Sequence, residues 1–132
     1  MRTLLFAAAL LALTGAGCGG SNTGRVKGQL VENGQPKVFP GMQASVEFRK
    51  IGDNGKPDPA KSYIAVLNPD GTFEVLASGG ELPVGTYAVS IQAVGKANGQ
   101  FKGFNPDESQ LRREVKPGPN EFQIDLARPS GS

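Results

Sequence analysis

The chain has 132 residues, with 14 Lys and Arg, 12 Asp and Glu, no His and one Cys, and its formal net charge is +2. The lack of histidine excludes Ser-His-Asp and Cys-His nucleophiles, and a single cysteine excludes an internal disulfide. Charges of both signs are scattered and nearly balanced, which argues against a nucleic-acid partner. The length favours one small domain, and the sequence predicts no catalytic residues, no metal and no cofactor.

The first 17 residues have the organisation of a signal peptide. Arg2 supplies a positive charge, residues 4–13 carry no polar side chain, and residues 14–17 are small and end at Cys18. The apolar run is shorter than the roughly 20 residues that a membrane-spanning helix needs. The sequence therefore predicts export.

The segment Leu-Thr-Gly-Ala-Gly-Cys at 13–18 resembles the lipobox of bacterial lipoproteins. The resemblance implies that Cys18 is diacylated and becomes the first residue of the mature protein, and Gly19 after it favours the outer membrane. Two acyl chains anchor a protein stably to a bilayer. Gly15 stands where the family usually has leucine, and the alternative is ordinary signal-peptidase cleavage that leaves Cys18 as a free thiol.

After the cysteine, residues 18–24 have the Gly- and Ser-rich composition of a flexible tether. Beyond them apolar and polar residues alternate with period two, which indicates half-buried strands. Six clear runs and a weaker one, at 111–115, show this alternation. The clear runs are 26–30, 46–49, 62–67, 72–75, 87–93 and 121–126.

Turn signals such as Asn33-Gly34 and the Asn-Pro-Asp-Gly segment at 68–71 separate these runs. No apolar stripe of helical spacing persists after the leader. We therefore expect an all-β domain at 25–128, an antiparallel sandwich or barrel of about seven strands, followed by a disordered tail at 129–132.

Several motifs occur in a particular order along these strands. They are Val-Lys-Gly-Gln-Leu at 26–30, Asn-Gly-Gln-Pro at 33–36, Val-Glu-Phe at 46–48, Pro-Asp-Gly-Thr-Phe at 69–73, Leu-Pro-Val-Gly-Thr-Tyr at 82–87 and Glu-Phe-Gln-Ile-Asp at 121–125. This order resembles the carboxypeptidase regulatory-like, or transthyretin-like, domain, and implies a Greek-key β-sandwich of Ig-like architecture. Transthyretin-related hydrolases of ureide metabolism use histidines and a C-terminal Tyr-Arg-Gly-Ser, which this chain lacks, so that activity is not expected.

The longest irregular segment, residues 95–108, is the candidate contact surface. It places Phe101 and Phe104 in a Gly-rich, polar setting, with Lys96 and Lys102 nearby. Aromatic rings beside cations can contact a glycan, a peptide or a protein. The alternative is that one or both phenylalanines fold back and cap an open end of the sandwich.

Four other features have a structural interpretation. Asp70 is typical of a turn that the side chain closes onto its own backbone, and Tyr87 is expected in the core or at a corner with its hydroxyl satisfied at the surface. The oxygen-rich segment 53–58 lacks the spacing of an EF-hand calcium loop. A crosslink between Lys27 and Asn120 is not expected, because Lys27 lies opposite the apolar face of its strand.

The sequence thus predicts an exported, non-enzymatic lipoprotein, a membrane-tethered structural or protein-interaction module at the cell envelope, facing the periplasm or the outer surface. Its expected partners are the membrane, through the lipid anchor, and an envelope protein or glycan. The alternative is a carbohydrate or small-ligand binding module that uses the 95–108 loop.

Overall fold

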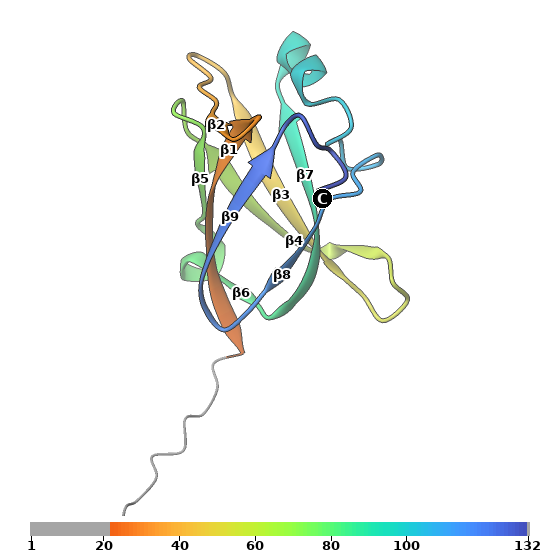
Figure 1. Cartoon of the computed structure of the whole chain (residues 1–132). Helices are drawn as coiled ribbons and strands as arrows, with labels where there is room; N and C mark the ends of the chain where they lie inside the picture. The colour runs from red at the N-terminus through yellow and green to blue at the C-terminus, as the bar shows by residue number, and fades with distance from the viewer. Residues whose placement is uncertain (1–21, 132) are drawn as a thin grey trace, which may run out of the picture.

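The computed structural model describes residues 22–131 (Figure 1). The predicted signal peptide, Cys18 and most of the predicted tether lie outside these residues. The described chain is mostly β, and none of its helices is long and apolar enough to cross a membrane. The strands are β1 (Thr23–Glu32), β2 (Gln35–Pro36), β3 (Ala44–Ile51), β4 (Pro57–Leu67), β5 (Thr72–Val75), β6 (Glu81–Pro83), β7 (Gly85–Ala93), β8 (Arg112–Val115) and β9 (Gly118–Asp125), with short 3-10 helices η1 (Ala77–Gly80) and η2 (Gly95–Phe101).

These strands form one strongly curled sheet in the order β2-β1-β5-β4-β3-β7-β8. β9 runs parallel to β1 over residues 24–31, while β5 is antiparallel to β1 over 27–29, so β5 and β9 lie on opposite sides of β1. The curl brings β8 and β9 near each other (Figure 1), and Arg113 Nη2 donates to the carbonyl oxygen of Gln123 at 3.1 Å. The predicted all-β, antiparallel class is confirmed, with β1–β9 as a parallel pair within it.

All seven predicted runs of alternation overlap a strand of four residues or more: β1, β3, β4, β5, β7, β8 and β9. The structure adds two shorter strands, β2 and β6, which lie outside the predicted runs. β1 begins at Thr23, so Thr23 and Gly24, which were expected in the tether, belong to the sheet.

An aromatic cluster fills the interior of the curl. The Phe48 ring lies 6.1 Å from Phe73, 6.3 Å from Phe122 and 6.4 Å from Tyr87, measured between ring centroids. The Tyr87 hydroxyl donates to the carbonyl oxygen of Pro83 at 2.6 Å. Tyr87 is therefore a core residue as predicted, although its hydroxyl is satisfied by a backbone carbonyl inside the domain and not at the surface. Burial raises the pKa of Tyr87 to about 12.

The turns follow the local signals. Asn33 and Gly34 both have positive φ, 52° and 80°, as a tight hairpin turn between β1 and β2 requires. The Asp70 carboxylate accepts hydrogen bonds from the backbone N–H and the hydroxyl of Thr72, at 3.0 and 2.6 Å. The structural interpretation of Asp70 is confirmed.

Residues 129–131 of the predicted disordered tail, 129–132, are instead packed on the domain, and Ser132 lies outside the described residues. A Cβ placed on Gly131 would lie 2.4 Å from a methyl carbon of Leu111, and one placed on Gly103 would lie 3.1 Å from Pro129. The Gly131 N–H donates to the carbonyl oxygen of Arg128 at 3.0 Å. These contacts extend the ordered domain past residue 128.

Candidate ligand-binding groove

The 95–108 loop does not present its aromatic rings to a partner. Phe101 and Phe104 are 0% and 1% exposed and belong to the hydrophobic core, and the Phe101 ring centroid lies 5.6 Å from that of Phe39. The prediction of both phenylalanines as contact residues is therefore wrong, and the alternative, that they fold back and cover the core, is confirmed. Lys96 and Lys102 are exposed, whereas the two rings beside which they were expected to act are buried.

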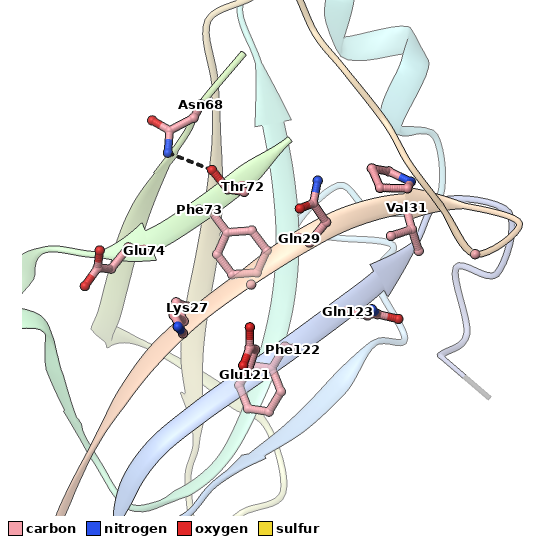
Figure 2. A pocket seen from close by; sticks show the side chains of 13 residues that line it. Lys27, Gln29, Val31, Asn68, Thr72, Phe73, Glu74, Glu121, Phe122 and Gln123 are labelled. Carbon is pink, nitrogen blue, oxygen red and sulfur yellow. Dashed lines mark hydrogen bonds between the residues drawn. The ribbon is translucent and has the colours of Figure 1, made fainter. Parts of the chain in front are cut away.

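A groove of about 660 Å³ lies instead over β9, β1 and β5 (Figure 2). Alternation along β1 sends Val26 and Leu30 into the core and brings Lys27 and Gln29 to the outside, into the groove. Its lining also includes apolar residues, namely Val31, Pro36, Phe73 and Phe122. Asn68 stands at its edge and donates from Nδ2 to the Thr72 hydroxyl at 3.0 Å. Three strands from distant parts of the chain thus share one surface.

Strand register aligns six polar side chains in two rows across the groove. Lys27 is paired with Glu74 on β5 and with Glu121 on β9, and we call these three residues the charged row. Gln29 is paired in the same way with Thr72 and Gln123, which form the amide row. Residues paired across neighbouring strands lie close enough for their side chains to interact.

Most of these polar groups have no partner within residues 22–131. Lys27, Glu74 and Glu121 form no ion pair there, and neither they nor the side chain of Gln123 make a hydrogen bond. The exceptions are Thr72, whose hydroxyl bonds to Asn68 and Asp70, and Gln29, whose Nε2 donates to the carbonyl oxygen of Asp70 at 2.9 Å and whose amide oxygen stays unused. The groove therefore offers unused donors and acceptors.

The outer face of β3, β4 and β7 is different, because its central carboxylate is fully satisfied. Glu47 is 6% exposed and accepts hydrogen bonds from Arg49 Nε at 2.9 Å, the Ser62 hydroxyl, the Ser90 hydroxyl at 3.4 Å and Gln92 Nε2 at 3.1 Å. Burial alone raises the pKa of Glu47, but the hydrogen bonds from Ser62 and Arg49, together with the charge of Arg49, outweigh burial and lower it below 4.5. Glu47 thus holds three strands together.

We expect acid to destabilise the fold through Glu47. Because its pKa is lower in the folded than in the unfolded chain, Glu47 contributes fully above about pH 4.5, and that contribution is lost as the pH falls through the folded pKa. Glu47→Gln should flatten the dependence of unfolding free energy on pH, measured by urea denaturation between about pH 3 and 6. Glu121→Gln, at an exposed and unpartnered carboxylate, should keep the wild-type profile. If the unfolding free energies of wild type and Glu47→Gln depended equally on pH, the stabilising role of the Glu47 carboxylate would be contradicted.

The Asn120 side chain, considered above as one end of a crosslink with Lys27, makes hydrogen bonds to the backbone of the domain. Asn120 Nδ2 donates to the carbonyl oxygens of Lys116, Gly118 and Arg25, at 2.8, 3.0 and 3.2 Å, and its side chain lies on the inner face. Lys27 lies on the outer face, so the two side chains are separated by the sheet.

In the 53–58 segment, Asn54 and Asp58 accept hydrogen bonds from the backbone N–H groups of Lys56 and Ala60, at 3.0 and 2.9 Å. Within residues 22–131 no three Cys, Asp or Glu side chains are grouped as a metal site would require. The oxygen atoms of this segment thus hold the turn between β3 and β4 in place.

Sequence reasoning missed the groove although it placed Lys27 on the outer face of its strand. Alternation also marks Glu74, Glu121 and Gln123 as outward, but it does not say which strands are neighbours. No protein-family model matches the chain, and no curated protein or solved structure matches it.

Proposed function

We propose that the chain is an exported lipoprotein that holds a non-enzymatic interaction domain against a membrane of the cell envelope. The observation that carries the proposal is the short distance along the chain between Cys18 and the sheet. β1 begins at Thr23, five residues after Cys18, and five extended residues span at most about 17 Å. An acylated Cys18 would keep the first residues of β1 close to the lipid headgroups.

The end of the domain nearest to that anchor consists of the start of β1, β6 and the turn before β9. Gly24 is paired with Leu82 and Gly118, and the Val84 N–H donates to the carbonyl oxygen of Asn22 at 2.9 Å. The β1–β2 hairpin and η2 lie at the other end (Figure 1). With the anchor at this end, the groove lies along the side of the domain and faces the surrounding envelope compartment.

The transthyretin-like Greek-key sandwich is part of the same proposal. β9, β1 and β5 form one wall of the curl, and β4, β3, β7 and β8 form the other. β4 and β5 join the walls through three residue pairs only, 65–67 with 73–75. Phe48 of one wall packs on Phe73 and Phe122 of the other, as the facing layers of a sandwich do.

We expect Cys18→Ser to release the protein from membranes. Wild type should incorporate labelled palmitate and sediment with membranes until detergent is added, because two acyl chains bind a bilayer stably. The Cys18→Ser variant should be unlabelled and soluble, whereas Ser21→Ala, which leaves the thiol in place, should fractionate like wild type. Unlabelled, soluble wild type would favour ordinary cleavage before Cys18 and overturn the anchored module.

A further inference from the structure

The groove alternates hydrogen-bond donors and acceptors at close spacing. In the charged row the carboxylates of Glu74 and Glu121 only accept, while the ammonium of Lys27 between them only donates. In the amide row Gln123 has both an unused donor and an unused acceptor, and Gln29 keeps an unused oxygen. Neighbouring strands are about 4.8 Å apart, so a ligand must present donors and acceptors at about that spacing.

Charge and polarity restrict the ligand further. Two carboxylates and one ammonium give the charged row a net negative charge, which disfavours an anion. An apolar ligand would remove water from several polar groups and give them no partner in return. The volume of about 660 Å³ falls in the range of about 300–1,000 Å³ that is usual for small-molecule sites. A polar ligand that carries no negative charge fits these conditions.

A saccharide fits the groove better than an extended peptide. Peptides commonly bind sheets by adding a strand to a free edge, but the floor strand β1 is already paired with β5 on one side and β9 on the other. Each hydroxyl of a sugar both donates and accepts, so adjacent hydroxyls can meet Lys27 and Glu121 together.

We propose that this groove binds a neutral saccharide, with Lys27, Glu121 and Gln123 as its polar contacts. The inference rests on the proposed function in so far as it names the partner of that interaction domain. It also moves carbohydrate recognition away from the 95–108 loop, whose rings are buried.

The test is isothermal titration of the detergent-solubilised full chain with maltotetraose, cellotetraose and N-acetylchitotetraose. At least one should bind saturably, with a dissociation constant of about 1 mM or lower. Lys27→Ala and Glu121→Gln should each weaken that binding by about tenfold or more, since each leaves an opposing polar group without its partner. Both side chains are exposed, so circular dichroism and thermal unfolding should match wild type. Lys102→Ala is the matched control, because Lys102 is an exposed lysine outside the groove, and it should bind like wild type.

Failure of all three neutral probes to bind would overturn the proposal. So would tighter binding of the acidic tetragalacturonate, or of an extended peptide, than of the neutral probes. Equal affinity in wild type, Lys27→Ala and Glu121→Gln would overturn it as well, by placing the saccharide elsewhere. The Cys18→Ser variant should bind the saccharide like wild type, so the two proposals can fail separately. If the saccharide proposal is wrong, binding is absent and membrane association remains. If the lipid-anchor proposal is wrong, membrane association is absent and saccharide binding remains.

Discussion

Replacing Phe48 by alanine should lower the free energy of unfolding by about 3–5 kcal/mol. Phe48 is fully buried on β3, a strand paired with β4 on one side and β7 on the other. Its ring packs against three other aromatic rings, which come from β5, β7 and β9. Those strands are fixed by their own pairings, so the surroundings can collapse only partly onto the cavity that the ring leaves.

Urea denaturation followed by circular dichroism measures this loss. The matched control is Leu76→Ala, because Leu76 is 67% exposed and its replacement should change the unfolding free energy by no more than about 0.5 kcal/mol. A Phe48→Ala variant that unfolds at the same urea concentration as Leu76→Ala would mean that the aromatic cluster does not hold the two walls of the curl together.

The aromatic cluster also shows how much of the fold the sequence could predict. Phe48, Phe73 and Tyr87 each lie in a run that alternates with period two, and a period of two assigns a side chain to the inner or outer face without any knowledge of its neighbours. The strands and their buried faces were therefore predictable. Tyr87 was recognised as a core residue for the same reason.

Strand order was not predictable, and the groove depends on it. Lys27 and Glu121 are far apart in sequence and become neighbours only because β9 enters the sheet beside β1 in parallel. Parallel pairing requires a long connection, and no turn signal near either residue specifies the partner strand. The composition of the 95–108 loop was misleading in the same way, because Phe101 and Phe104 sit among glycines and polar residues but belong to the buried core, where the Phe101 ring packs on Phe39.

The burial of Glu47 was also not predictable from the sequence. Alternation along β3 places it on the outer face, where a carboxylate is ordinarily solvated and satisfied by water. Its burial arises from Ser62 on β4 and from Ser90 and Gln92 on β7, which surround it only after the three strands have paired. The same outer face therefore carries a satisfied carboxylate at Glu47 and unsatisfied ones at Glu74 and Glu121. Only the register of neighbouring strands distinguishes them.

Replacing Gly28 by alanine should lower the free energy of unfolding by about 1–3 kcal/mol or more. A Cβ placed on Gly28 would lie 2.3 Å from the carbonyl oxygen of Phe122 and 2.3 Å from Cζ of the Phe73 ring. The Phe73 ring is packed on Phe48, and the carbonyl belongs to the backbone of β9, so neither can move without disturbing the core or the β1–β9 pairing. The added methyl group therefore forces a shift of backbone or ring.

Gly99→Ala is the matched control in the same denaturation measurement, because a Cβ on Gly99 meets no atom within 4 Å. Equal stability of the two variants would show that β1 and β9 do not approach as closely as described. Lys27 and Gln29 flank Gly28 on β1, and each is paired with a groove residue on β9. A backbone shift at Gly28 would separate these pairs, so the glycine that permits close approach inside the sheet also sets the spacing of both polar rows outside it.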